Sequence, residues 1–293
     1  MKYVVLGAAG QLGHELCPRL EGEVVGLTRG QADLTQHESL RATLAELRPD
    51  FVVNCAAYNF VDRAEREPDA AFAANAWGVR ALATICRDLD CTLVHFGTDY
   101  VFGVEGARKS PYQEIDAPGP VNVYGLSKLA GEYLVRAVCP KHVVIRTCGL
   151  YGVRGSGGKG GNFVETMLRI AQANKPLRVV SDQVCTPSYA ADVAEATARL
   201  LAAGGHGLYH FTNAGSCSWY EFAVAIFEVA GVKADLTAIS SLEFGAAAWR
   251  PVYSVLASRL PPLRPWREAL EAYLRERACR GPVSPRASAS ALA

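Results

Sequence analysis

Short apolar runs alternate with helical segments through the first half of the chain. The strand candidates are residues 3–6, 23–27, 51–54, 92–96 and 142–146, and the helical segments between them are 11–20, 38–47, 69–89 and 124–139. Strands that are apolar throughout are buried on both faces, as in a parallel sheet covered by helices on each side. Because the crossovers between parallel strands are right-handed, this alternation predicts an α/β fold with a Rossmann-like, doubly wound parallel sheet.

The pattern changes after Tyr151. A glycine-rich loop at 152–161 is followed by helices at 162–172, 190–203 and 219–230 and by strands at 177–180 and 207–212. These strands are too few for a second large sheet, so we expect a small mixed α/β substrate-binding lobe over the carboxyl ends of the main strands. The expected dinucleotide-binding domain is 1–148 plus about 188–204, and the expected lobe is 149–187 and 205–278. Residues 279–293 are rich in Ser, Ala, Pro and Arg without periodicity, which predicts a disordered tail.

Composition excludes several classes of function. The formal net charge of +1 over 293 residues gives no support for nucleic-acid or membrane partners. No apolar run is long enough to span a bilayer, and the N-terminus lacks the pattern of a signal peptide. The nine cysteines are scattered without a CxxC pair, which indicates reduced thiols in a cytoplasmic protein. The six histidines show no ligand spacing, so we expect no metal.

Three glycines lie between the first predicted strand and the first predicted helix. Gly7 permits the tight turn, Gly10 lets the backbone approach a pyrophosphate, and Gly13 lets the helix pack on the strand. Gln11 and Leu12 open that helix, whose free N–H groups favour an anion. The loop therefore predicts a dinucleotide site, and the alternative is a tight turn that binds nothing.

The second strand bears on the choice of cofactor. It ends in Thr28 and Arg29, without the acidic residue that holds a ribose diol in many NAD sites. Arg29 could face a 2′-phosphate, which favours NADPH, or it could be a solvated surface arginine, which leaves NADH open. Asp33 and Leu34 follow at a spacing suited to the adenine end.

Tyr124 and Lys128 form a YxxxK pair at the start of a predicted helix. Residues i and i+4 share one helical face, so the phenol and the ammonium can converge. The ordinary pKa of tyrosine is near 10, and a neighbouring cation favours the phenolate. In reduction, Tyr124 would deliver a proton to a carbonyl oxygen, and Lys128 would also bind the nicotinamide ribose. The alternative is an exposed helix face.

Thr98 and Asp99 follow the fourth strand, where ligands of doubly wound sheets bind. The Thr98 hydroxyl could polarise a substrate carbonyl, and Asp99 could fix a sugar hydroxyl or instead cap a local turn. His95, within the strand, is interpreted as a buried core or cofactor-wall residue.

Taken together, these residues resemble the dTDP-4-dehydrorhamnose reductase family. The resemblance runs from the first strand to about Leu274. The matching segments are 7–13, 48–58, 61–65, 98–102, 122–132, 162–164, 182–183, 217–222 and 250–256.

The resemblance implies reduction of the 4-keto group of a nucleotide-linked 6-deoxyhexose by NADPH or NADH. The expected reaction converts dTDP-4-dehydrorhamnose to dTDP-L-rhamnose, or is closely related. Tyr124 and Lys128 would be the catalytic pair, and a homodimer is plausible by analogy. The residues expected to border the cofactor are Gly10, Gln11, Leu12, Asp33, Leu34, Ala56, Ala57 and Tyr58; those expected near the substrate are Thr98, Asp99, Gly149, Asn162, Gln183 and Arg250.

Three departures from the family pattern leave the exact sugar open. Gly97 replaces a common serine, and Cys148-Gly149 replaces a Ser-Trp pair whose indole packs on the sugar. Loss of that ring opens the pocket, and the loop at 153–161 is expected to order on substrate binding. No acidic cluster near the C-terminus matches the metal-bridged dimer contact of some members.

Two other functions share this fold. Nucleotide-sugar epimerases and dehydratases carry the same loop and YxxxK pair, but dehydratases typically have Asp-Glu where this chain has Asp99-Tyr100. The resemblance also includes an NADP-binding regulatory subunit of methionine adenosyltransferase, which would keep the fold without turnover. Intact Thr98, Tyr124 and Lys128 favour an enzyme.

Overall fold

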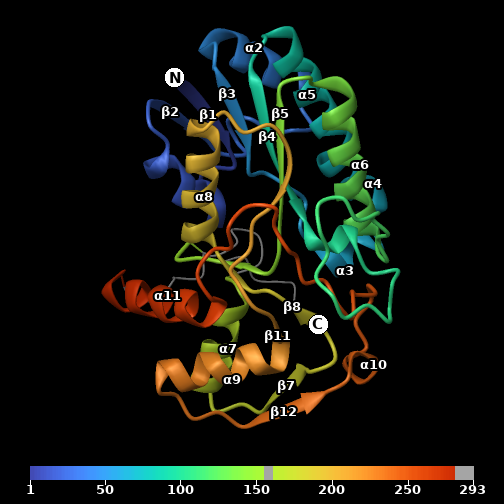
Figure 1. The fold of residues 1–293 in the computed structure, drawn as a ribbon, viewed down its shortest axis with the longest axis vertical. Coiled ribbons are helices and arrows are strands. Elements are labelled where there is room, and N and C mark those ends of the chain that lie inside the picture. The colour runs from blue at the N-terminus through green and yellow to red at the C-terminus, as the bar shows by residue number, and fades with distance from the viewer. Residues whose placement is uncertain (155–160, 281–293) are drawn as a thin grey trace.

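The computed structural model describes residues 1–154 and 161–280. Its centre is a parallel sheet with the strand order β10-β5-β4-β3-β1-β2 (Figure 1), which confirms the predicted Rossmann-like fold. The expectations for the tail and for most of the loop at 153–161 lie outside the described residues. The strands are β1 (Lys2–Leu6), β2 (Glu23–Leu27), β3 (Phe51–Asn54), β4 (Thr92–Thr98), β5 (His142–Thr147) and β10 (Gly207–His210).

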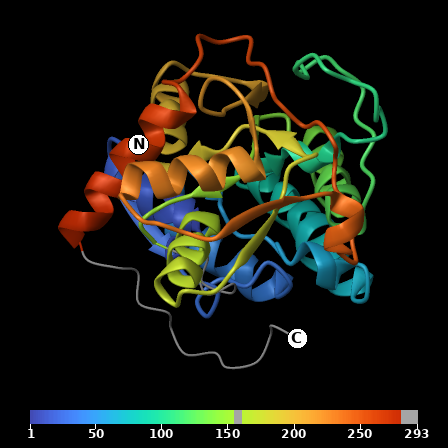
Figure 2. The same ribbon diagram turned by 90° about the horizontal axis from the view of Figure 1, so that it is seen from below.

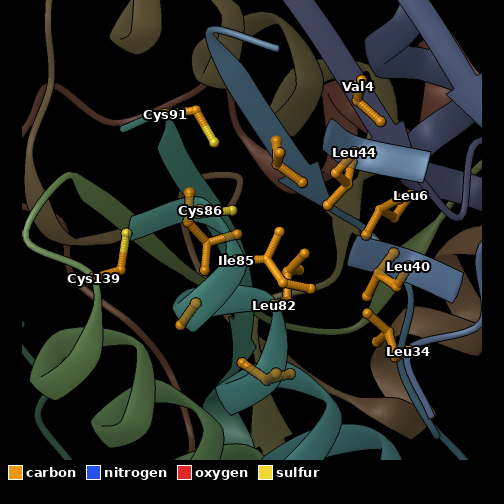
Figure 3. Close-up of a cluster of buried hydrophobic side chains, with 14 of the residues drawn as sticks. Val4, Leu6, Leu34, Leu40, Leu44, Leu82, Ile85, Cys86, Cys91 and Cys139 are labelled. Atoms are coloured by element: carbon orange, nitrogen blue, oxygen red, sulfur yellow. The ribbon is translucent and has the colours of Figure 1, made fainter. Parts of the chain in front are cut away.

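Helices cover both faces of this sheet, which explains why its strands are apolar throughout. On one face, α1 (Gln11–Leu16), the short helix η1 (Cys17–Arg19) and α8 (Ala190–Ala202) pack on alternate strand residues such as Val5 and Val53. On the other face, α2 (His37–Leu47), α5 (Gly78–Asp88) and α6 (Val123–Val138) pack on Val4 and Leu6. Figure 3 shows this second core, where Leu40, Leu44 and Leu82 meet the strands.

The segment expected as one helix at 69–89 is helical throughout but contains an irregularity. It is built from α4 (Pro68–Phe72), a π-helical turn η2 (Ala73–Trp77) and α5. Three short helices, α3 (Val61–Ala64), η3 (Asp99–Val101) and α10 (Ser241–Phe244), were not predicted because four or fewer residues carry no periodicity.

A smaller unit lies below the carboxyl ends of the strands (Figures 1 and 2). Its core is aromatic, and the Tyr151 ring contacts those of Tyr189, Phe222 and Tyr273. The elements of this lobe are β6 (Leu150–Tyr151), α7 (Phe163–Gln172), β7 (Leu177–Val180), β8 (Val184–Cys185), β9 (Ser188–Tyr189), β11 (Cys217–Ser218), α9 (Trp219–Ala230), β12 (Leu236–Ile239), α10 (Ser241–Phe244) and α11 (Trp266–Arg280).

One assignment within the expected lobe is wrong. Residues 205–278 were given to the lobe, but β10 is the edge strand of the large sheet and pairs in parallel with β5. The physical reason is that Leu208 packs on one core of the sheet and Tyr209 on the other, as residues of a strand covered on both faces do. Within the described residues, no helix is both long and apolar enough to cross a membrane.

Candidate active site

The glycine turn after β1 is built as its sequence predicts. Gly7 has a φ of +75°, and the N–H groups of Gly7 and Ala8 donate to the Leu27 carbonyl at 2.9 and 3.1 Å. A Cβ on Gly7 would lie 2.9 Å from the Ala56 nitrogen, and one on Gly13 would collide with the Gly7 carbonyl. A Cβ on Gly10 would meet only that carbonyl oxygen, at 3.2 Å. Gly10 therefore presents backbone on the open side of the turn, where a bulky anion can approach.

The two residues after Gly10 differ in their surroundings. Gln11 donates from Nε2 to the Leu150 carbonyl at 3.4 Å, and its buried Oε1 has no hydrogen-bond partner within the described part of the chain. Leu12 is buried in the core between the sheet and α8, so only its backbone can face a cofactor.

The turn after β2 carries an exposed ion pair. Arg29, with a side chain 86% exposed, donates to Asp33 at 2.8 Å, and Asp33 also accepts from the Thr35 N–H and hydroxyl. Although partial burial acts to raise it, these bonds from Arg29 and Thr35 hold the pKa of Asp33 at about 2. Thr28 donates to Gln31, and Leu34 is buried, so the charged groups at this turn are Arg29 and its partner Asp33.

The segment after β3 is fixed by two buried asparagines. Asn54 accepts from the Ala56 N–H at 3.1 Å, and Asn75 accepts from the Tyr58 N–H at 2.9 Å. Asn75 also donates to the Tyr58 carbonyl at 2.8 Å. Ala57 between them is exposed. Since Gly7 contacts this segment, the turns after β1 and β3 form one surface at the point where strand order reverses, which is where such sheets bind ligands.

Tyr124 and Lys128 lie in the first two turns of α6. Asn122 caps this helix by accepting from the Gly125 N–H at 2.7 Å. Lys128 is 3% exposed and donates from Nζ to the Phe96 carbonyl at 2.6 Å, and burial lowers its pKa to about 8 against the opposing effect of Glu132. Burial raises the pKa of Tyr124 to about 12, opposed by a hydrogen bond with Thr98.

A hydrogen-bonded cluster surrounds Asp99 beside this pair. Its carboxylate accepts from the hydroxyls of Thr98 and Ser254 at 3.2 and 2.6 Å and from the Cys148 thiol at 3.1 Å. Burial raises the pKa of Asp99 to about 6, although these three donors act to lower it. Thr98 also accepts from the Tyr100 N–H, so the turn cap that was considered for Asp99 is provided by Thr98.

Behind the cluster, a buried ion pair joins α6 to β5. Glu132 receives hydrogen bonds from Nε and Nη2 of Arg146 at 2.8–3.2 Å, and both side chains are 2% exposed. A Cβ on Gly97 would collide with the Glu132 carboxylate. Glycine at 97, in place of the family's common serine, leaves this space to the ion pair.

The residues expected near the substrate divide into two groups. Gly149 and Arg250 lie beside the cluster. Gly149 has a φ of +51°, and a Cβ at this position would be 3.3 Å from the Trp219 ring. Arg250 forms an ion pair with Asp62 at 2.6 Å and faces Tyr100. Asn162 and Gln183 are engaged within the lobe. Asn162 caps α7 and donates to the Gly152 carbonyl, and Gln183 donates to Ser241.

Sequence reasoning missed three residues of this site. Asn75 gave no signal, because its contacts depend on the π-helical turn. Cys148 was considered only as a departure from the family pattern, yet its thiol faces Asp99. Ser254 lies within a matching segment that was assigned no role. His95 is buried, as expected, with Nδ1 3.1 Å from Asn54, and burial holds its pKa well below the usual range. No group of three or more metal-ligating side chains occurs among residues 1–154 and 161–280.

Comparison with known proteins gives consistent matches over nearly the whole chain. The family model described as "RmlD substrate binding domain" matches residues 1–279. The spore coat polysaccharide biosynthesis protein SpsK of Bacillus subtilis is 42% identical, covering 94% of this chain and 98% of its own. A dTDP-4-dehydrorhamnose reductase of Mycolicibacterium smegmatis is 40% identical, covering 92% and 84%. The solved dTDP-4-dehydrorhamnose reductase of Bacillus anthracis, in complex with NADP, is 37% identical with a TM-score of 0.89, covering 94% and 99%.

Proposed function

Since the chain belongs to the RmlD family of dTDP-4-dehydrorhamnose reductases, we propose that it reduces the 4-keto group of a dTDP-linked 6-deoxyhexose with NADPH. The favoured reaction is the conversion of dTDP-4-dehydrorhamnose to dTDP-L-rhamnose. A closely related 4-keto sugar is the second candidate, because Cys148-Gly149 stands where the family pattern has a Ser-Trp pair whose indole packs on the sugar.

The residues at the strand-order reversal fit a dinucleotide. Gly10 offers open backbone, and the Gln11 Oε1 atom is buried without a partner in the described residues. Arg29 carries an exposed positive charge where a 2′-phosphate would lie, and a surface ion pair such as Arg29–Asp33 costs little to rearrange. The cofactor, when bound, supplies the hydride.

Tyr124 is suited to act as the acid in reduction. With a pKa of about 12 its phenol is protonated at neutral pH and can give that proton to the oxygen of the reduced carbonyl. The Lys128 ammonium, held by the Phe96 carbonyl, stabilises the resulting phenolate. The Thr98 hydroxyl shares a hydrogen bond with Tyr124 and can polarise the carbonyl.

The assignment of roles to the two units is also part of this proposal. The large sheet with its turns would bind the cofactor, and the lobe would bind the sugar nucleotide. A cytoplasmic location is supported by the nine scattered cysteines without a CxxC pair. A homodimer is proposed by analogy with the family.

The observation that carries the proposal is the hydrogen bond between Thr98 and Tyr124, with Lys128 one turn further along α6 and bonded to the Phe96 carbonyl of the strand that ends in Thr98, in a chain with reductase relatives. The test follows NADPH oxidation with enzymatically prepared dTDP-4-keto-6-deoxyhexoses and identifies the product sugar. We expect turnover that Tyr124→Phe lowers by at least about 100-fold, since general acid catalysis is worth about 10²–10⁴. Tight NADPH binding without turnover of any such sugar would instead support a regulatory subunit.

A further inference from the structure

Three cysteines connect the lobe to the carboxylate of Asp99. Cys148 directly follows β5, and its thiol donates a hydrogen bond to Asp99 at 3.1 Å. The same thiol is hydrogen-bonded to that of Cys185 in β8. Cys185 in turn pairs with Cys217 across the antiparallel strands β8 and β11. All three thiols are free, and the proposed reduction uses none of them.

Neighbouring thiols in this row are close enough to form a disulfide. Paired residues of antiparallel strands present their side chains on one face, with Cα atoms about 4.5–5.5 Å apart. Disulfides need a Cα separation of about 4.4–6.8 Å, so the strand pairing of Cys185 with Cys217 meets this requirement. Cys148 and Cys185 already contact each other through their sulfur atoms. Cys185 can therefore bond to either neighbour, but to only one at a time.

An oxidant can reach this row of thiols from the surface. Cys217 lies in the wall of a surface cavity of about 530 Å³, together with Tyr220, Glu221 and Trp266. Cys148 and Cys185 are buried, with 2% and 4% of their surface exposed. A small oxidant such as hydrogen peroxide therefore meets Cys217 first.

We propose that Cys148 and Cys185 are a redox-sensitive pair, which hydrogen peroxide converts to a disulfide that inhibits the reductase. The inhibition rests on the proposed function, whereas formation of the disulfide does not. Disulfides within the cytosol are usually transient and redox-sensing, which agrees with a pair that is reduced in the active protein.

The oxidation proceeds in three steps. Peroxide oxidises the Cys217 thiol to a sulfenic acid and releases one water. Cys185 attacks that sulfur and displaces a second water, which leaves the disulfide Cys185–Cys217. Cys148 then attacks the sulfur of Cys185, and Cys217 departs as a thiol after taking a proton from water in the cavity.

Asp99 supplies the base for the last of these steps. Burial raises the pKa of the Cys148 thiol, and the hydrogen bond with Cys185 adds to this effect, so the thiol must lose its proton to a base as it attacks. Asp99 already accepts a hydrogen bond from Cys148 and can take that proton. When Asp99 returns the proton to solvent, two thiols and one peroxide have given one disulfide and two waters.

The disulfide would change the site in two ways. It removes one of the donors to Asp99 and leaves the hydroxyls of Thr98 and Ser254. It also joins the end of β5 covalently to β8, a strand of the lobe. Since a displacement of about 1 Å can lower a rate about 100-fold, both changes should slow the reaction of the sugar.

The experiment treats the wild type, Cys185→Ala and Cys91→Ala with hydrogen peroxide, which catalase removes before the assay. Cys91 and Cys86 form another buried, hydrogen-bonded pair (Figure 3) at the other end of β4 from Asp99, so Cys91→Ala is a matched control. The measurements are the disulfides, mapped by mass spectrometry of alkylated peptides, the Kd for NADPH, and kcat/KM with the keto sugar before and after dithiothreitol.

In the wild type and in Cys91→Ala, peroxide should form the Cys148–Cys185 disulfide and lower kcat/KM by about tenfold or more. The Kd for NADPH should not change, and dithiothreitol should restore activity. Cys185→Ala should have the untreated activity of the wild type and keep it after peroxide. Inactivation of Cys185→Ala at the wild-type rate would overturn the proposal, as would an inactivated wild type in which both thiols remain free. Cys185→Ser, closer in size, provides the same test if the alanine variant does not fold.

Cys217→Ala tests the route of the oxidant. Without this thiol in the cavity wall, the Cys148–Cys185 disulfide should form at least several-fold more slowly, and an unchanged rate would overturn entry at Cys217. Wild-type protein that reduces no keto sugar would sink the proposed function alone, because peptide mapping would still show whether the disulfide forms. An active reductase in which peroxide leaves Cys148 and Cys185 as thiols would sink the redox pair alone.

Discussion

At the residue scale, burial shifts the pKa values of the site residues towards their uncharged forms. Burial disfavours charge, so it raises the pKa of Tyr124 to about 12 and lowers that of Lys128 to about 8. The acid therefore keeps its proton at neutral pH, while most of the lysine remains charged. The same burial raises the pKa of Asp99 to about 6.

Lys128 predicts an alkaline limit to activity. Its ammonium loses the proton as the pH rises through about 8, and the stabilisation of the phenolate is lost with it. We expect kcat to fall above about pH 8 and Lys128→Met to be impaired at every pH. A kcat that stays level up to pH 10 would contradict this role of Lys128.

Asp99 predicts a pH dependence of stability. The pKa of Asp99 is about 6 in the folded protein and near 3.9 in the unfolded chain. Between these two pH values the carboxyl is therefore protonated in the folded protein and ionised in the unfolded chain. The free energy of unfolding should fall by an amount on the order of 3 kcal/mol as the pH rises from 4 to 6. It should remain at the lower value above pH 6. Urea unfolding at several pH values should show this fall in the wild type and a flatter profile in Asp99→Asn. Matching profiles in the two proteins would count against a raised pKa of Asp99.

At the element scale, the Glu132–Arg146 pair holds the catalytic helix against β5. Removing one partner of a buried ion pair leaves the other charge uncompensated, which typically costs about 3–5 kcal/mol. We expect Glu132→Gln to lower the free energy of unfolding by a large part of this amount, because Arg146 would stay buried and charged. Denaturant unfolding measures it, with the exposed pair Arg199–Glu195 as control through Glu195→Gln. A loss as small as that of the control would mean that the pair is unimportant.

The elements of the fold differ in how far their sequences reveal them. β2, β3, β7 and α9 have the predicted bounds, because each is a continuous apolar run or has clear periodicity. α11 was missed because its charged residues surround the few that pack, Leu270 and Tyr273 among them.

In the site, the glycine turn and the YxxxK pair are local patterns and could be predicted. The contacts of Asn75, Cys148 and Ser254 arise only when distant segments meet, and no local pattern encodes them.

At the scale of the whole molecule, the chain passes from the sheet into the lobe and back before the sheet is complete. β5 ends at Thr147, the lobe begins with β6, and β10 returns as the edge strand at Gly207. The two units are therefore not independent segments of sequence, and neither contains all of its strands in one stretch.

A truncation tests this interdependence. A chain ending at residue 204 lacks β10 and leaves the edge of β5 unpaired, and exposed edges of apolar strands associate. We expect this fragment to aggregate on size-exclusion chromatography, whereas a chain ending at residue 280 should elute as the full-length protein does. A soluble, cooperatively unfolding fragment would show that the first five strands suffice.

The late return of β10 also sets an order of events during synthesis. At about 5–20 residues per second, the ribosome needs about 3–12 s to add the residues between Thr147 and Gly207. The edge of β5 is thus left unpaired for seconds before β10 can cover it. This interval makes the nascent chain a client for chaperones, and synonymous codons that slow translation across the lobe should lower the yield of folded protein without changing a single residue.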